Sequence, residues 1–312
     1  MIEKRTYVSK FDGTPQPAMC QAAGSASEAR PLLVALHTWS FTYEADCSAY
    51  AALCARNDWH MIFPHFRGPN WHPDACGSDL VVSDLEDAVA YMCENHRVDP
   101  RRIYLVGGSG GGHCSLLMAG RRPDLWSAVS AWCPISDIAL WYRQSRERNN
   151  SYADNIAQSC GGDPEVSAAA RREARLRSPL TWLKNAVGRV PVDISTGIHD
   201  GHTGSVPVGQ AIRAYNMLAA EADRISEADI AYIEKTETVP AHLAAAAGDP
   251  AFGSRPVYLR RQSGFVRLTL FEGGHDIIPE ISGEWLARQV GGAAPDWSPG
   301  RPLEARIAEL SK

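Results

Sequence analysis

A glycine-rich turn between a short apolar strand and a helical segment constrains this chain more than any other feature. Residues 103–106 (Ile-Tyr-Leu-Val) are typical of a buried strand, and residues 107–112 follow with Ser109 as their one residue other than glycine. A sharp strand-to-helix turn strains its central residue and leaves no space for neighbouring side chains, so small neighbours are required. The pattern predicts that Ser109 lies at the carboxyl end of a strand, where its hydroxyl is presented near the N-terminus of the next helix.

Two nucleotide-binding loops also use glycine-rich turns, and neither fits this segment. A dinucleotide-binding turn needs a third glycine three residues after the second, and counting from Gly108 and Gly110 that position holds His113. A phosphate-binding loop needs Gly-Lys followed by Ser or Thr, and no lysine lies nearby. A purely structural turn stays open as the alternative to a nucleophilic serine.

Short apolar runs alternate with helical patterns along the chain, which is typical of βαβ units and a mostly parallel sheet flanked by helices. The expected strands are residues 6–9, 17–21, 32–37, 60–64, 103–106, 128–133, 192–197 and 266–271. The expected helices are residues 45–57, 78–94, 111–121, 208–222 and 281–290. Two inserts interrupt the alternation: a lid-like helical one after the sixth core strand (139–185) and a second one (223–262). We therefore expect one domain over residues 1–292 and a Pro- and Gly-rich tail, 293–312, that ends in a short helix.

Composition and charge exclude some partners and leave the cellular location open. The chain carries 31 basic and 36 acidic residues, and its net charge of −5 gives no pull toward nucleic acid or an anionic membrane. No apolar run reaches the roughly 18 residues of a membrane-spanning helix. The N-terminal residues lack the apolar stretch of a secretory signal, which favours a cytoplasmic protein, while a secreted or periplasmic protein with its signal removed stays open.

The eight cysteines show no metal-ligand spacing, so we expect buried free thiols and no metal site. Cys76 and Cys160 each precede a glycine in loop-like sequence. If a disulfide forms, these two cysteines are the expected pair.

Two residues that follow later strands complete a candidate triad with Ser109. Triads built on such a serine turn run in the chain order Ser, Asp or Glu, then His. His275 follows the last expected strand, and Asp200 follows the strand before it. A carboxylate at Asp200 would accept a hydrogen bond from the His275 ring, fix its tautomer and stabilise the imidazolium. Asp137 is the main rival for the acid, and Asp276 lies too close to His275 in the sequence.

An oxyanion hole needs two backbone N–H donors aimed at the developing alkoxide. Gly110, directly after the nucleophile, is expected to supply one donor. The loop after an early strand is expected to supply the second, from Trp39 by position or otherwise from Thr38.

Taken together, these residues resemble the prolyl oligopeptidase-like branch of the α/β-hydrolases over nearly the whole chain. The matching segments are residues 11–14, 84–91, 102–103 with the Ser109 turn, 161–164, 177–180, 197–200, 206–207 and 274–275. The resemblance implies the α/β-hydrolase fold and a Ser-Asp-His hydrolase without a cofactor. The spacing of Gly197 to Asp200 is the family's, which favours Asp200 as the acid.

The chain departs from the family pattern in three places. Five residues, 201–205, separate Asp200 from Val-Pro where the family has two, which predicts an enlarged loop beside the acid. The early loop reads His-Thr-Trp where many relatives have His-Gly, so we expect the side chain of Trp39 to project into the site. About 30 residues precede the core, too few for the β-propeller of the family's oligopeptidases, which favours propeller-free esterases, including those acting on plant polysaccharides.

Four side chains are candidates for substrate binding. Arg67 would pair with a substrate carboxylate or equally with a structural acid, and Trp71 would stack on a sugar ring. His37, at the end of an early strand, and His202, beside the candidate acid, are two further candidates. Residues 141–184 hold eight basic and five acidic residues, a local excess of +3 that suggests an anionic substrate such as a uronic-acid polymer.

The sequence therefore predicts a serine esterase acting on a small-molecule or carbohydrate ester, with no nucleic-acid or membrane partner. A prolyl oligopeptidase-like serine peptidase is the alternative, and a catalytically inactive binding module is the third hypothesis. The oligomeric state stays open.

Overall fold

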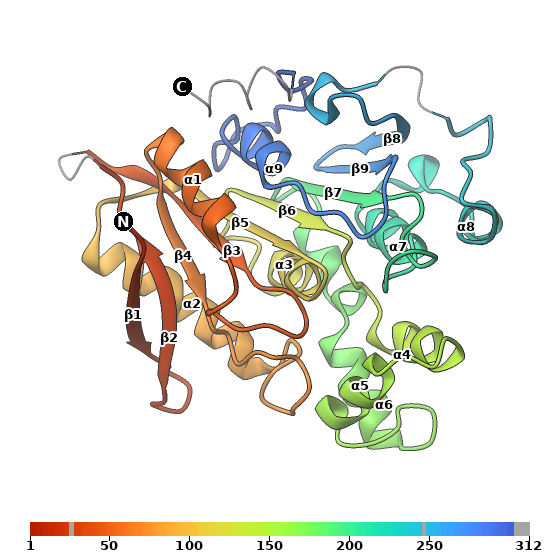
Figure 1. The fold of residues 1–312 in the computed structure, drawn as a ribbon, viewed down its shortest axis with the longest axis horizontal. Coiled ribbons are helices and arrows are strands. Elements are labelled where there is room, and N and C mark those ends of the chain that lie inside the picture. The colour runs from red at the N-terminus through yellow and green to blue at the C-terminus, as the bar shows by residue number, and fades with distance from the viewer. Residues whose placement is uncertain (25–27, 245–247, 303–312) are drawn as a thin grey trace.

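A mostly parallel sheet forms the centre of the protein in a computed structural model, which describes residues 1–24, 28–244 and 248–302 (Figure 1). Its strands are β1 (Glu3–Val8), β2 (Pro15–Gln21), β3 (Arg30–Leu36), β4 (His60–Pro64), β5 (Val98–Gly108), β6 (Ala128–Trp132), β7 (Val192–Gly197), β8 (Val257–Ser263) and β9 (Val266–Phe271). They are ordered β1-β2-β4-β3-β5-β6-β7-β9-β8, and the segment from β4 to β9 is parallel throughout. The mostly parallel sheet that the sequence predicts is confirmed.

Helices cover both faces of the sheet because its central strands are apolar on both sides. The helices are α1 (Ser48–Asn57), α2 (Asp79–Asn95), α3 (Gly110–Arg121), α4 (Ile138–Glu147), α5 (Tyr152–Cys160), α6 (Ala168–Arg177), α7 (Gly209–Leu218), α8 (Glu227–Thr236) and α9 (Pro279–Leu286). Successive residues of a strand point to opposite faces. In β3, Leu32 and Val34 pack in the core layer that contains α2, α3 and α7, and Leu33 packs in the layer with α1 and α9.

The second insert differs from its expected form in one respect. Part of 223–262 is the strand β8, which pairs antiparallel with β9 at the edge of the sheet. The sequence did not indicate this strand because Arg260, Arg261 and Gln262 interrupt its apolar pattern, as an edge strand with solvent contact permits. The short C-terminal helix expected at the end of 293–312 lies outside the described residues.

Helices α4, α5 and α6 make up most of the lid insert and lie together at one end of the molecule (Figure 1). Their buried side chains join the loop after β3 in one apolar group, here called the lid cluster. The lid cluster consists of Trp39, Cys76, Ile135, Ile138, Trp141, Tyr142, Ala153, Ile156, Cys160, Ala170, Ala174 and Val206. Within it the ring centroids of Trp39 and Trp141 are 4.8 Å apart. The lid is therefore anchored by a core of its own to the loops at the end of the sheet.

A hydrogen bond also connects the lid to the enlarged loop after β7. The indole Nε1 of Trp141 in α4 donates to the carbonyl oxygen of Ser205 at 3.0 Å. Val206, the next residue, belongs to the lid cluster. The lid therefore restrains the loop 201–205, which the sequence predicts to be enlarged.

All eight cysteines are free thiols, including the buried Cys76 and Cys160 of the lid cluster. In the described part of the chain, every helix is too short or too polar to cross a membrane.

Candidate active site

Ser109 lies in a strained turn between β5 and α3. Its backbone has φ 55° and ψ −120°, a conformation that residues with a side chain rarely adopt. The turn is fixed by the hydrogen bond from the Ser109 N–H to the Trp132 carbonyl oxygen of β6, 2.9 Å long. A Cβ atom at Gly107 would lie 2.4 Å from the carbonyl oxygen of Gly111, so this position accepts glycine alone. Gly107 therefore leaves the space that the turn around Ser109 needs, as the sequence predicts.

Asp200 and His275 are joined by a hydrogen bond across two neighbouring strands. Asp200 follows β7 and His275 follows β9, and these strands pair in parallel, so their carboxyl ends meet. Asp200 Oδ2 accepts from His275 Nδ1 at 2.8 Å. The carboxylate is buried (1% exposed) and its other oxygen accepts from the Val206 N–H at 3.2 Å. A buried, anchored carboxylate is suited to hold the histidine ring in one tautomer.

The serine turn lies against the histidine loop. A Cβ atom at Gly108 would lie 2.1 Å from the Ile277 side chain, two residues beyond His275. The connecting strands β5, β6, β7 and β9 are consecutive neighbours in the sheet. The structure therefore brings Ser109, Asp200 and His275 to the side of the sheet where its parallel strands have their carboxyl ends.

The two rival acids are engaged elsewhere. Asp137 is the N-cap of α4, where its Oδ1 accepts from the Leu140 N–H at 3.0 Å. Asp276 pairs with Arg255 Nη1 at 2.9 Å. Neither makes a hydrogen bond to His275 within the described residues, so the geometry favours Asp200.

The two preferred oxyanion donors come from loops that touch. A Cβ atom at Gly110 would lie 2.5 Å from the backbone nitrogen of Trp39, so the two backbones approach as closely as glycine allows. Within the described residues the Trp39 N–H donates to no protein acceptor, which leaves it available to a ligand. The Thr38 N–H likewise donates to no acceptor among the described residues and stays the second choice. This arrangement is consistent with Gly110 and Trp39 as the donors, which stays a prediction.

The expectation that the Trp39 side chain projects into the site is wrong. The side chain is 1% exposed and packs in the lid cluster, where Nε1 donates to Asn155 Oδ1 at 3.2 Å. The reason is that the lid offers both an aromatic partner, Trp141, and a hydrogen-bond acceptor.

Arg67 and His37 are structural side chains. For Arg67 this is one of the two roles that the sequence left open, and for His37 it contradicts the expected role in substrate binding. Arg67 Nη1 pairs with Asp12 at 2.8 Å, and its Nε pairs with the fully buried Asp84. The guanidinium holds the pKa of Asp12 well below its usual value. His37 is 2% exposed and stacks on Phe66 with a centroid distance of 3.9 Å, and burial lowers its pKa to about 4. These side chains stabilise the loop after β4.

The other two candidates for substrate binding are His202 and Trp71, whose surroundings could not be inferred from the sequence alone. His202 is part of the enlarged loop, and its Nε2 donates to the Glu234 carbonyl oxygen of α8 at 2.7 Å. It therefore binds the second insert. Trp71 is 39% exposed in the loop after β4, and its contact with a substrate stays a prediction.

A cluster beside the triad was missed by sequence reasoning. His199 precedes Asp200, and its two ring nitrogens face Glu237 Oε2 at 2.7 Å and Glu272 Oε1 at 3.2 Å. Glu237 is the C-cap of α8, and Glu272 begins the loop that carries His275. We call His199, Glu237 and Glu272 the His199 clamp. It joins the second insert to both loops of the acid–base pair.

Glu237, followed by Glu272, raises the pKa of His199 above its ordinary value of about 6.5. A raised folded-state pKa means that the protonated form is stabilised by folding, fully below about pH 6.5 and progressively less as pH rises through the folded pKa. The melting temperature of the wild type is therefore expected to fall as pH rises from about 6.5 to 8, and that of His199→Gln is expected to fall less. Thermal unfolding over this range measures it, with His72→Gln as the control histidine outside the clamp. Parallel pH profiles for His199→Gln and wild type would contradict the clamp.

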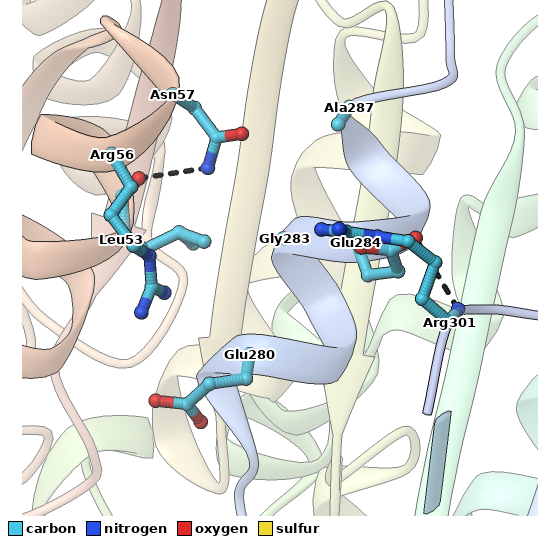
Figure 2. Close-up of a pocket in the computed structure, with 8 residues that line it drawn as sticks. All are labelled: Leu53, Arg56, Asn57, Glu280, Gly283, Glu284, Ala287 and Arg301. Atoms are coloured by element: carbon cyan, nitrogen blue, oxygen red, sulfur yellow. Dashed lines mark hydrogen bonds and ion pairs between the residues drawn. The ribbon is translucent and has the colours of Figure 1, made fainter. Parts of the chain in front are cut away.

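A separate pocket of about 140 Å³ lies between α1 and α9 (Figure 2). Charged side chains line it, and Arg301 pairs there with Glu284 at 3.4 Å. Ser109, Asp200 and His275 are not among its lining residues. The pocket is therefore distinct from the candidate active site.

A serine at a strained turn after a parallel strand, with a base loop after the last strand of that sheet, defines the α/β-hydrolase class of serine hydrolases. The family model described as "Prolyl oligopeptidase family" matches residues 47–235. The chain belongs to the prolyl oligopeptidase family.

Two curated relatives match part of the chain. Poly(3-hydroxyalkanoate) depolymerase C of Paucimonas lemoignei is 27% identical over 139 residues, which cover 40% of this chain and 33% of the depolymerase. The acylamino-acid-releasing enzyme of Rattus norvegicus is 28% identical over 142 residues, which cover 45% of this chain and 18% of that enzyme. The matches span a third or less of either relative's length.

Solved structures show the same fold. The uncomplexed acylaminoacyl peptidase of Pyrococcus horikoshii superposes with a TM-score of 0.60 at 16% identity, covering 98% of this chain and 44% of that one. Oligopeptidase B from Leishmania major gives a TM-score of 0.58 at 13% identity, covering 92% of this chain and 35% of that one. The predicted α/β-hydrolase fold is confirmed.

Proposed function

We propose that this protein hydrolyses carboxylic esters through an acyl-enzyme on Ser109. The observation that carries the proposal is the hydrogen bond between the buried Asp200 and His275, beside the strained Ser109 turn. His275 would take the proton of the Ser109 hydroxyl as it attacks the ester carbonyl, then return that proton to the leaving alcohol. Water activated by the same ring would release the acid. Gly110 and Trp39 would donate to the tetrahedral oxyanion.

The charges of the side-chain clusters argue against an anionic substrate. His199 is engaged by two glutamates, Asp276 by Arg255, and Arg67 by two aspartates. The carboxylates outnumber the basic groups in these clusters, so the clusters are poor partners for an anionic substrate such as a uronate. The relative named poly(3-hydroxyalkanoate) depolymerase acts on a polyester by its name, which also supports ester cleavage.

A carbohydrate ester is the finer form of the proposal. Trp71 is partly exposed and would stack on a sugar ring. Because Arg67 pairs with Asp12 and Asp84, it is not available to bind a substrate carboxylate. This favours a neutral acylated sugar over the uronic-acid polymer that the positive charge of residues 141–184 suggested. In the lid itself, Arg146 pairs with Asp163 and Glu165, and Arg177 is buried.

Peptide cleavage is the second candidate, and the match to the acylamino-acid-releasing enzyme supports it. One experiment separates the two activities. Purified protein is assayed with p-nitrophenyl acetate, an acetylated neutral oligosaccharide, a 3-hydroxybutyrate oligomer and an N-acetyl-amino-acid p-nitroanilide. Each kcat/KM is divided by the rate constant of uncatalysed hydrolysis of the same substrate, because activated esters are intrinsically more reactive than anilides. We expect the largest ratio for one of the esters, and a largest ratio for the anilide would overturn the proposal in favour of a peptidase.

A further inference from the structure

A buried thiol lies against the acid–base pair. Cys133 follows β6 directly, is fully buried, and has a positive φ of 44°. Its Sγ donates to the Asp276 carbonyl oxygen at 3.3 Å. One ligand atom each from Cys133, Asp200 and His275 lie within 4.8 Å of one another. Sulfur, carboxylate oxygen and imidazole nitrogen therefore lie close enough together to be candidate ligands of one ion.

These three donors suit a soft divalent cation. Zinc takes cysteine sulfur, histidine nitrogen and carboxylate oxygen at about 2.0–2.3 Å in a tetrahedral arrangement, which places its ligands about 3.3–3.8 Å apart. Because the three ligand atoms already lie within 4.8 Å of one another, small side-chain shifts would bring them to that geometry. A thiolate and a carboxylate would balance a charge of +2, which is favourable at a site where Cys133 and Asp200 are buried.

We propose that Cys133, Asp200 and His275 form an inhibitory binding site for a soft divalent cation such as Zn²⁺ or Cd²⁺. The cation bonds to Sγ of Cys133, an oxygen of Asp200 and Nδ1 of His275. The thiol releases one proton to solvent. The neutral imidazole keeps its single proton, which transfers from Nδ1 to Nε2 through solvent.

The tautomer of His275 explains why the bound cation inhibits. With Nδ1 bonded to the metal, the proton of the neutral ring resides on Nε2. Nε2 is the nitrogen that accepts the Ser109 proton in the proposed mechanism, so the ring loses its function as a base. The same cation displaces the hydrogen bond from His275 to Asp200. Inhibition thus rests on the proposed function, whereas binding of the cation does not.

Cadmium is the probe of choice because its bond to a thiolate produces a charge-transfer absorption in the ultraviolet. Cd²⁺ is titrated into wild type, Ser109→Ala, Cys133→Ala and Cys133→Ser, with absorbance recorded for each. The matched control is Cys93→Ser, since Cys93 is an exposed free thiol away from the triad. Ester hydrolysis is followed in parallel and normalised to the metal-free rate of each variant, and a chelator tests reversibility.

We expect wild type, Ser109→Ala and Cys93→Ser to show the same absorption at one equivalent of cadmium. Cys133→Ala and Cys133→Ser should bind at least about tenfold more weakly, as loss of a ligand predicts, and their normalised activity should resist cadmium. Absorption that disappears in Cys93→Ser, or persists unchanged in both Cys133 variants, would overturn the site. Since Ser109→Ala reports binding without catalysis, a failure of the esterase proposal leaves the metal site separately testable.

Discussion

Ser109→Ala is expected to lower kcat for ester hydrolysis by about 10³- to 10⁶-fold, the range seen when the nucleophile of a serine hydrolase is removed. This corresponds to about 4–8 kcal/mol of lost transition-state stabilisation. The reason is that the methyl group left by the substitution cannot form an acyl-enzyme, and only the oxyanion donors and substrate binding remain. Initial rates with p-nitrophenyl acetate, the simplest ester of the panel, measure the loss.

The same variant should keep its fold. The Ser109 side chain makes no capping hydrogen bond to α3, so its removal is expected to change the free energy of unfolding by less than about 1 kcal/mol. Ser115→Ala is the matched control, because it removes a buried, unpartnered hydroxyl from α3, the helix that follows Ser109. It should retain wild-type activity. Residual activity of a tenth or more in Ser109→Ala would remove this residue from the nucleophile role.

Asp200→Asn is expected to lower kcat by about 10⁴-fold. Asparagine has nearly the same shape, but its amide no longer fixes the Nδ1–H tautomer of His275 or stabilises the imidazolium that forms during attack. The Val206 N–H can still bond the amide oxygen, so the enlarged loop should stay in place. Steady-state kinetics with p-nitrophenyl acetate, together with thermal unfolding, separate the loss of catalysis from a loss of stability.

Asp137→Asn tests the choice between the two carboxylates. Asp137 is the N-cap of α4, and asparagine caps helices about as well as aspartate. We therefore expect little change in either activity or stability. If Asp137→Asn lowered kcat as strongly as Asp200→Asn, the assignment of the acid from geometry would be wrong.

Local patterns were sufficient to bring Ser109, Asp200 and His275 to one edge of the sheet. Each residue lies at or shortly after the carboxyl end of an apolar strand, and parallel strands place such residues at the same edge. The edge strand β8 escaped detection because its polar residues resemble a surface loop. Strand burial is therefore the property that made the core of the fold predictable.

The surroundings of the triad depended on contacts between distant parts of the chain. Arg67 is neutralised in part by Asp12, 55 residues earlier, and His199 is engaged by Glu272, 73 residues later. No local pattern encodes such pairs. The orientation of the Trp39 side chain similarly depends on an indole, Trp141, that arrives with the lid. Charge compensation and lid packing thus decide which side chains remain for substrate.

The hydrogen bond from Trp141 to Ser205 has a consequence for protein engineering. A lid exchanged between homologues as an independent cassette would lose this bond, and with it a restraint on the loop that contains Asp200. Chimaeras should therefore transplant residues 139–185 and the loop 201–205 together. The lid insert and the loop beside Asp200 therefore form one exchangeable unit.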